Sequence, residues 1–217
     1  MQVSPWDFVK GVVPFSLSDF PGAASAVLFT GGCNLRCPTC HNYSLLNLAS
    51  TPPYGKGRFL SEIEGTEGFL DGIVVSGGEP TIVPGLADLL SELRAVVPNI
   101  CLHTNGHRPE VVESLLSVGL VDLFAVDVKG PWAKYPLLTG DRYPADESRR
   151  RLTDIFRLAE SHRSRFMFRT TPVPALDEED LVEVSKLLPE GFTHHINTYR
   201  PPSSCEGAQG ARIHDAA

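Results

Sequence analysis

Apolar, strand-like runs alternate with amphipathic, helix-length segments along most of this chain, and this alternation limits its fold more than any other feature. We predict strands at residues 24–30, 72–76, 100–104, 123–128, 165–171 and 194–200. Apolar residues recur at helical spacing in residues 85–97, 109–118, 146–161 and 177–188, which lie between them. This order is typical of βαβ units and a parallel sheet.

Six βα units are too few to close an eight-stranded barrel. We therefore predict an α/β fold, namely an open, partial (βα)6 barrel of the TIM type with parallel strands. The 217 residues are enough for one domain with its own hydrophobic core. We predict a single domain over residues 1–217, with its core at 15–201, an N-terminal extension at 1–14 and a C-terminal covering tail at 202–217.

Composition and charge exclude several classes of protein. Hydrophobic residues make up 42% and charged residues 21%, as in globular proteins, so the chain is not a disordered one. A net charge of −7 provides no basic field for a phosphate backbone, and we expect no nucleic acid partner. No basic region precedes an apolar segment at the start, and no run reaches about 18 apolar residues. We expect a cytoplasmic protein that does not contact a membrane.

Polar, glycine-rich loops follow the first four predicted strands, with the sequences TGGC, SGGEPT, HTNG and DVKGP. Parallel strands joined by right-handed crossovers place all their carboxyl ends at one edge, where barrels and open α/β sheets bind ligands. These four loops are therefore the predicted ligand site.

The first of these loops holds three cysteines, Cys33, Cys37 and Cys40. They form a CxxxCxxC pattern that spans eight residues and directly follows Gly31 and Gly32. Bunched thiols in a reducing compartment more often bind metal or carry out redox chemistry than form cross-links. Two further cysteines stand apart: we predict that Cys101 is a buried core thiol, and we assign no role to the loop thiol Cys205.

Three interpretations of the cysteine pattern are open. A structural zinc site needs four closed ligands, but His41 is adjacent to Cys40 and the chain has no second CxxC. A redox dithiol of Cys37 and Cys40 leaves Cys33 unexplained. The spacing favours an iron–sulfur cluster over both.

A cubane cluster has four irons, so three cysteines leave one iron open for a ligand. The spacing resembles the radical S-adenosylmethionine (SAM) superfamily, and the resemblance implies a [4Fe-4S] cluster and SAM as cofactors. In that family the open iron chelates the amino and carboxylate groups of SAM. An electron from the reduced cluster then breaks the bond between sulfur and C5′ and yields a 5′-deoxyadenosyl radical.

The other loops provide candidate contacts for SAM. Gly77 and Gly78 expose backbone and Glu79 offers a carboxylate to an ammonium group, although GGEP is also an ordinary strand-to-helix turn. The resemblance implies that this motif contacts the methionine amino group. Asn105 suits ribose hydroxyls or a carboxylate, although its loop is also a common helix-capping turn.

Charged residues at three later strand ends complete the predicted cofactor site. Asp127 and Lys129 lie two residues apart, so their side chains share one face of a strand end. Arg169 and Arg200 each offer a guanidinium to a carboxylate, and a solvated strand terminus is the alternative for all four residues. We predict no catalytic residue beyond the cofactor site.

The segment Phe15–Asn42, FSLSDFPGAASAVLFTGGCNLRCPTCHN, resembles the activating proteins of anaerobic ribonucleoside-triphosphate reductases, which belong to the glycyl-radical-enzyme activases. The later motifs GGEPT, TNG, DxK, RTT and YRP occur in family order, so the resemblance covers residues 15–201. It implies an oxidoreductase that removes a Cα hydrogen from a glycine of a partner glycyl radical enzyme, anaerobic ribonucleotide reductase in the first instance.

Two residues depart from the family pattern. Thr39 replaces the usual aromatic residue before the last cysteine, and His103 stands where an acidic residue is common. No further cysteine cluster interrupts the chain, so we expect electrons from an external one-electron donor such as flavodoxin or ferredoxin. The alternatives are activation of pyruvate formate-lyase or another glycyl radical enzyme, a radical SAM reaction on a small molecule, and a non-enzymatic metal-binding module.

Overall fold

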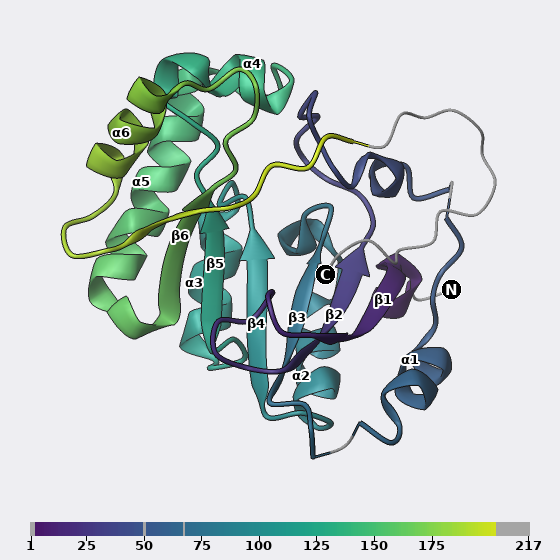
Figure 1. Cartoon of the computed structure of the whole chain (residues 1–217). Coiled ribbons are helices and arrows are strands. Elements are labelled where there is room, and N and C mark those ends of the chain that lie inside the picture. The colour runs from purple at the N-terminus through teal and green to yellow at the C-terminus, as the bar shows by residue number, and fades with distance from the viewer. Residues whose placement is uncertain (1–2, 50, 67, 203–217) are drawn as a thin grey trace.

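One seven-stranded sheet organises the chain in a computed structural model that describes residues 3–49, 51–66 and 68–202 (Figure 1). Its strands pair in sequence order from β1 to β7. Strands β2 to β7 run parallel, and β1 is antiparallel to β2. The strands are β1 Val9–Ser16, β2 Ser25–Thr30, β3 Gly72–Gly77, β4 Asn99–Thr104, β5 Leu123–Asp127, β6 Phe166–Thr170 and β7 His194–Ile196.

Within the described residues, six α-helices and several short 3-10 turns accompany these strands. The helices are α1 Lys56–Ile63, α2 Leu86–Arg94, α3 Pro109–Ser117, α4 Tyr135–Thr139, α5 Ala145–Ser161 and α6 Glu178–Leu187. The 3-10 turns are η1 Pro5–Phe8, η2 Tyr43–Leu46, η3 Pro80–Ile82, η4 Trp132–Lys134 and η5 Arg163–Arg165. Among the described residues, no helix has the length and apolar character needed to cross a membrane.

The sheet and its helices confirm the predicted α/β fold, an open partial barrel of parallel strands. Because β2 to β7 follow one another without a change of direction, their helices pack on one face of the sheet (Figure 1). That face carries the main hydrophobic core, in which Leu28, Val75, Leu102, Val126 and Phe168 are fully buried. This burial is the main stabilising term of the fold.

The opposite, open face of the sheet differs along the length of its strands. A small apolar cluster of Val27, Val74, Cys101 and Ala125 fills its lower part, which confirms Cys101 as a buried thiol. Side chains alternate along strands with period two. On β3 to β6 the next residues on this face, toward the carboxyl ends, are polar, namely Ser76, His103, Asp127 and Arg169, whereas β2 has Phe29. The open face thus has an apolar floor and a polar rim.

Strand β1 is the main feature that the sequence prediction missed. The predicted N-terminal extension at 1–14 is in part a strand, and β1 pairs antiparallel with β2 at the edge of the sheet. Gly11 and Pro14 interrupt its apolar pattern, and proline is tolerated only in edge strands or bulges. The register shifts between Val13 and Ser16, as a bulge produces.

The remaining elements agree with the prediction except at their ends. The four predicted helices are present as α2, α3, α5 and α6. Helix α6 begins with a capping box in which Asp177 and Asp180 each accept a hydrogen bond from the other's backbone N–H. The last strand was predicted over 194–200 but ends at Ile196. The short helices α1 and α4 were not predicted, and residues 203–217, most of the predicted tail and Cys205, lie outside the described residues.

Candidate functional site

The cysteine loop, residues 31–42, leaves the carboxyl end of β2 and is fixed at both sides. Leu35 is buried with 1% of its surface exposed, and the backbone N–H of Arg36 donates to the carbonyl of Thr139 at 3.0 Å. A tight turn closes the loop, in which the backbone N–H of Cys40 donates to the carbonyl of Cys37 at 3.1 Å. The three cysteines therefore follow a backbone held by its own hydrogen bonds.

The three cysteine residues of this loop are partly exposed, but their sulfur atoms have little contact with solvent. Burial raises the pKa of Cys33 to about 12 and also raises the pKa of Cys37 and Cys40. The thiols therefore keep their protons at neutral pH unless a metal centre displaces them. Within the described part of the chain, no three His, Cys, Asp or Glu side chains converge as the ligands of one metal ion do.

The predicted glycine pair packs directly against the entrance of the cysteine loop. The backbone N–H of Gly78 donates to the carbonyl of Thr30 at 2.8 Å, and the N–H of Glu79 donates to the carbonyl of Gly32 at 2.9 Å. A Cβ at Gly78 lies 1.9 Å from the Gly32 carbonyl oxygen, and Gly77 has a φ of +113°. Side chains are excluded at both positions, so the close approach of the two loops requires glycine.

Glu79 lies inside the protein and does not face open space. Its carboxylate accepts hydrogen bonds from the Thr81 hydroxyl at 2.5 Å, the Thr81 N–H at 3.2 Å, the Thr104 hydroxyl at 2.7 Å and the Asn105 N–H at 2.7 Å. Burial raises its pKa, and these hydrogen bonds oppose the rise. The side chain ties the loop after β3 to the loop after β4, and its predicted contact with a ligand stays a prediction.

Asn105 joins the loop after β4 to the cysteine loop. Its Nδ2 donates to Oδ1 of Asn34 at 2.7 Å and lies 3.9 Å from the sulfur of Cys33. Its Oδ1 accepts from the backbone N–H of His107 at 3.0 Å. Among the predicted cofactor-binding residues, Asn105 lies nearest to a cysteine sulfur by the contacts that the structure records.

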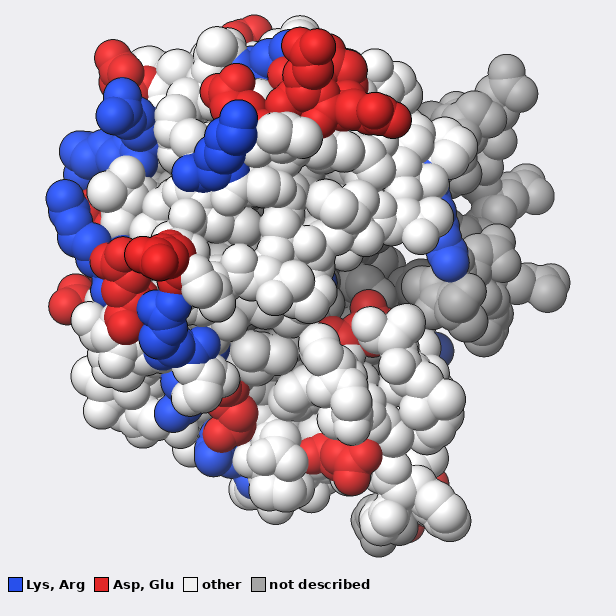
Figure 2. Space-filling model, turned by 60° about the vertical axis from the view of Figure 1, so that its left-hand side comes forward, with Lys and Arg blue, Asp and Glu red and all other residues white. Residues whose placement is uncertain are grey.

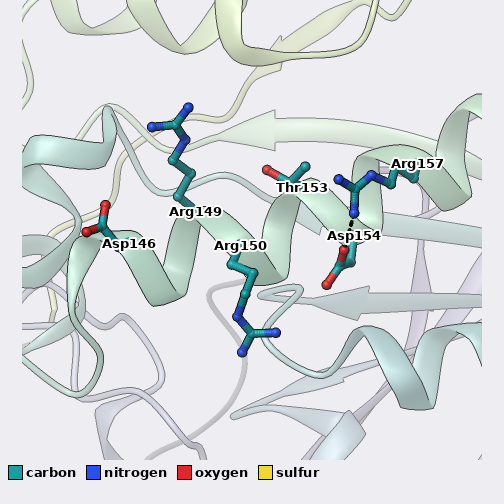
Figure 3. A pocket seen from close by; sticks show the side chains of 6 residues that line it. All are labelled: Asp146, Arg149, Arg150, Thr153, Asp154 and Arg157. Carbon is teal, nitrogen blue, oxygen red and sulfur yellow. Dashed lines mark hydrogen bonds and ion pairs between the residues drawn. The ribbon is translucent and has the colours of Figure 1, made fainter.

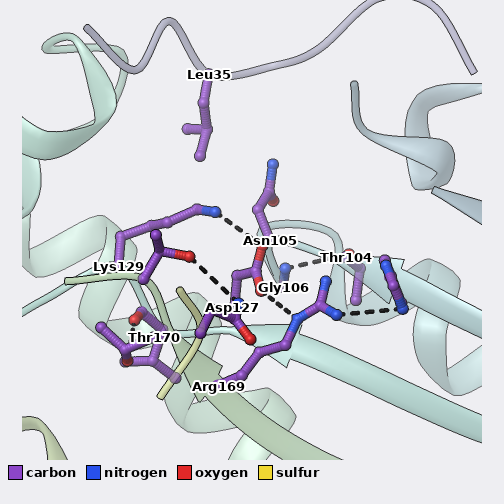
Figure 4. Close-up of polar contacts among 12 residues, drawn as sticks. Leu35, Thr104, Asn105, Gly106, Asp127, Lys129, Arg169 and Thr170 are labelled. Atoms are coloured by element: carbon purple, nitrogen blue, oxygen red, sulfur yellow. Dashed lines mark hydrogen bonds and ion pairs between the residues drawn. The ribbon is translucent and has the colours of Figure 1, made fainter. Parts of the chain in front are cut away.

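Asp127, Lys129 and Arg169 form a connected group at the polar rim (Figure 4), and His103 joins it through Arg169. We call these four residues the strand-end cluster. Asp127 and Arg169 are register partners on β5 and β6, and Arg169 Nε donates to Asp127 Oδ1 at 2.6 Å. Lys129 Nζ donates to Asp127 Oδ2 at 2.9 Å, as the period-two argument predicts. Leu35 of the cysteine loop points toward this cluster (Figure 4).

The charges of the strand-end cluster hold one another in their ionised forms. Burial acts to raise the pKa of Asp127, but Arg169 and Lys129 together lower it well below its usual range. Burial likewise acts to lower the pKa of Lys129, and the charge of Asp127 outweighs it and raises that pKa. One carboxylate thus faces two cations, and the cluster keeps one positive charge in excess at neutral pH.

His103 is buried at 8% exposure and extends the cluster toward residue 19. Its Nδ1 lies 3.1 Å from Ser76 Oγ, and its Nε2 lies 3.1 Å from both the Asp19 carbonyl oxygen and Nη1 of Arg169. Burial lowers the pKa of His103 to about 3, with a further contribution from Arg169. The neutral ring either accepts from Arg169 or donates to Asp19 through Nε2, according to its tautomer.

Arg200 and Thr39 are two further residues that the sequence analysis singles out. Arg200 is exposed and follows the last residue of β7 by four positions, so it does not continue the strand as predicted. Thr39 lies in the turn between Cys37 and Cys40. The site residue that sequence reasoning missed is Asn34, whose partner Asn105 is 71 residues away, so that no local pattern marks it.

A second polar region lies on the outer surface of α5, away from the strand ends. It is a shallow hollow of about 290 Å³ lined by Asp146, Arg149, Arg150, Thr153, Asp154 and Arg157 (Figure 3). Its arginines point in different directions, and acidic and basic side chains lie next to one another over this part of the surface (Figure 2). This arrangement presents no concentrated charge to a ligand.

Comparison with known proteins gives one family match and several relatives. The family model described as the radical SAM superfamily matches residues 27–188. A candidate glycyl-radical enzyme activating enzyme of Methanocaldococcus jannaschii is 34% identical over 200 residues, which are 89% of this chain and 80% of the relative. The pyruvate formate-lyase-activating enzyme of Clostridium pasteurianum is 26% identical over 178 residues, which are 78% of this chain and 70% of that enzyme.

Among solved structures, native anSMEcpe with bound AdoMet and the Cp18Cys peptide resembles this chain with a TM-score of 0.53. The match covers 79% of this chain and 49% of the solved chain, at 16% sequence identity. A likeness at this level of identity supports the open barrel fold alone.

Proposed function

We propose that this chain, which belongs to the radical SAM superfamily and within it to the glycyl-radical enzyme activating family, generates a glycyl radical in a partner enzyme. The family implies a [4Fe-4S] cluster and SAM as cofactors. When bound, the reduced cluster supplies one electron that cleaves SAM to methionine and a 5′-deoxyadenosyl radical, which takes a hydrogen atom from the glycine Cα. The residues of the chain bind and orient these groups and exclude water.

The single observation that carries this proposal is the position of the cysteine loop beside the strand-end cluster. Cys33, Cys37 and Cys40 are the proposed cluster ligands. Sulfur donors suit iron, and three cysteine ligands leave one iron of a four-iron cluster open for SAM. The buried Nδ2 of Asn34, which has no partner, also fits a site that receives an acceptor-rich group.

The strand-end residues are suited to the polar parts of SAM. Lys129 and Arg169 carry one positive charge more than Asp127 neutralises, and this excess favours the methionine carboxylate. The backbone around Gly77 and Gly78 lies against the cysteine loop and is the proposed contact of the methionine amino group. We assign Asn105 to the ribose or the carboxylate of SAM. Arg200 is assigned to the cofactor site from the family motif YRP alone.

The substrate glycine is proposed to reach the site from the open face of the sheet, with anaerobic ribonucleotide reductase as the partner. The order of the motifs from residue 15 to residue 201 supports this choice. Pyruvate formate-lyase is the second candidate, because the activating enzyme of Clostridium pasteurianum is among the relatives. An external one-electron donor, flavodoxin or ferredoxin, completes the proposed system.

Electron paramagnetic resonance tests the proposed function. The reconstituted chain is mixed without oxygen with SAM, dithionite and either reductase or lyase, and we expect the doublet of a glycyl radical with one of them. Omission of SAM is the control and gives no doublet. A reconstituted chain that cleaves SAM but gives no doublet with either enzyme contradicts the proposed reaction with these partners and favours a small-molecule radical SAM reaction.

A further inference from the structure

One side-chain atom in the described part of the chain is buried and has no hydrogen-bond partner: Nδ2 of Asn34, in the cysteine loop. Buried polar groups in folded proteins are nearly always paired, and an unpaired buried donor is destabilising. Its position between Cys33 and Leu35 is next to a proposed cluster ligand. We therefore look for the missing hydrogen-bond acceptor in a group that the cysteine loop binds.

A chain of hydrogen bonds fixes the orientation of this amide. The backbone N–H of His107 donates to Oδ1 of Asn105 at 3.0 Å, which leaves Nδ2 of Asn105 to act as the donor toward the cysteine loop. That Nδ2 donates to Oδ1 of Asn34 at 2.7 Å. Rotating the Asn34 amide by 180° places two NH2 groups against each other, so the network requires that the unpaired atom be the nitrogen.

One cysteine sulfur, that of Cys33, lies beside this pair of amides. Oδ1 of Asn34 lies 3.8 Å from the sulfur of Cys33, and Asn105 Nδ2 lies 3.9 Å from that sulfur. The backbone N–H of Leu35 already donates to Cys33 at 3.4 Å. Amide donors thus gather at one end of the cysteine loop, where a metal-bound thiolate or an inorganic sulfide is a strong acceptor.

We propose that Asn34 donates an N–H···S hydrogen bond from Nδ2 to a sulfur atom of the bound iron–sulfur cluster, and that Asn105 and His107 position it for this bond. The inference rests on the proposed function, because it needs the cluster. Hydrogen bonds to the sulfurs tune the reduction potential of such clusters. The added electron makes the sulfurs more negative, so the bond stabilises the reduced form and raises the potential.

The test uses the full chain, reconstituted with iron and sulfide without oxygen and without SAM. Asn34→Leu removes the donor at similar volume, and Asn47→Leu, at an exposed position directly after η2, is the matched control. In a redox titration followed by electron paramagnetic resonance, we expect a more negative midpoint potential for Asn34→Leu and the wild-type potential for Asn47→Leu. An unchanged potential in Asn34→Leu at full iron content overturns the inference.

A second measurement identifies the atom. Asparagine labelled with ¹⁵N only at the side chain is incorporated, and hyperfine coupling of that nitrogen to the reduced cluster is recorded. Asn105 Nδ2 lies 3.9 Å from the sulfur of Cys33 and is labelled in both proteins, so the measurement compares the wild type with Asn34→Leu. We expect one coupling in the wild type that is missing from Asn34→Leu. Identical couplings in the two proteins, or no coupling in the wild type, overturn the inference.

The outcomes separate this inference from the proposed function. If Asn34→Leu does not retain iron, Asn34→Asp replaces it in the hyperfine measurement, because Asp keeps the oxygen that accepts from Asn105 but lacks the nitrogen donor. A wild-type cluster with normal iron content and no amide coupling rejects only the hydrogen bond. A wild-type chain that binds no cluster rejects the proposed function, and this inference with it.

Discussion

Two arginine–carboxylate pairs of this protein have the same nitrogen–oxygen distance but differ in their exposure to solvent. Arg169 on β6 and Asp127 on β5 lie 2.6 Å apart, with side chains 15% and 25% exposed. Arg157 and Asp154 on α5 also lie 2.6 Å apart, but their side chains are 71% and 36% exposed. The first pair is held by strand register at a ligand-binding edge, and the second is a helical pair in solvent.

The comparison shows that distance alone does not identify a functional ion pair. Exposed pairs contribute about 0–1 kcal/mol because water screens them and long side chains lose freedom when they pair. A pair fixed by two neighbouring strands has already lost that freedom through folding. Its side chains are therefore already oriented before a ligand binds. The strand-end cluster has this fixed orientation, and the surface of α5 lacks it.

The largest expected effect is that of Gly78→Ala, which places a Cβ 1.9 Å from the Gly32 carbonyl oxygen. The loop after β3 must then move away from the cysteine loop, and we expect cluster retention to fail and SAM cleavage to fall by at least about 100-fold. Iron content and 5′-deoxyadenosine formation measure this. Gly57→Ala in α1 is the control, since a Cβ there meets nothing within 4 Å and alanine stabilises a helix by about 0.5–1 kcal/mol. Wild-type cleavage by Gly78→Ala contradicts the account.

Exchange of arginine for methionine in each pair tests the comparison itself. Arg169→Met leaves Asp127 with Lys129 as its remaining cation, and we expect a loss of about 2–3 kcal/mol in the free energy of unfolding of the metal-free chain. Arg157→Met should change it by no more than about 0.5 kcal/mol. Urea unfolding without oxygen measures both. The comparison is wrong if the two variants lose equal stability.

His103 adds a dependence on pH that the surface of α5 does not provide. Its pKa falls from 6.5 to about 3 on folding, so the unfolded chain binds the proton between these values. Its contribution to stability is complete above pH 6.5 and is lost as the pH falls toward 3. Between pH 6.5 and pH 3, this histidine changes the free energy of unfolding by up to about 1.4 kcal/mol per pH unit.

Urea unfolding at several pH values between 8 and 4 measures this contribution. Replacement of His103 by Asn should reduce the slope of the unfolding free energy against pH below pH 6.5. Between pH 7 and 8 the slope should not change, because the histidine is neutral in both the folded and the unfolded chain. His107, whose pKa is lowered to about 4 by burial, keeps part of the slope in the variant. Equal slopes for the wild type and the variant below pH 6.5 are incompatible with a buried, neutral His103.

Much of the sheet and part of the site could be predicted from local patterns. The parallel strands follow from apolar runs separated by helical segments, and the Asp127–Lys129 contact follows from the period of two along a strand. Strand β1 could not be predicted in this way, because Gly11 and Pro14 break its pattern and its strand character depends on pairing with β2.

The rest of the site depends on contacts between distant segments. The Asp127–Arg169 pair requires the register of β5 on β6, and the burial of Glu79 requires donors from the loop after β4. Arg200 was predicted at a strand end because its run was read to residue 200, whereas pairing with β6 extends only to Ile196. Sequence spacing identifies candidate residues, and tertiary pairing decides where each side chain lies.

The central claim is that the cysteine loop holds a cluster that cleaves SAM, and 5′-deoxyadenosine formation measures it most directly. Wild-type protein, Cys37→Ala and the matched control Cys101→Ala, at a fully buried thiol outside the loop, are reconstituted without oxygen and given SAM and dithionite. We predict that the wild type and Cys101→Ala bind iron and form 5′-deoxyadenosine, and that Cys37→Ala does neither. Product from Cys37→Ala, or none from a fully iron-loaded wild type, contradicts the claim.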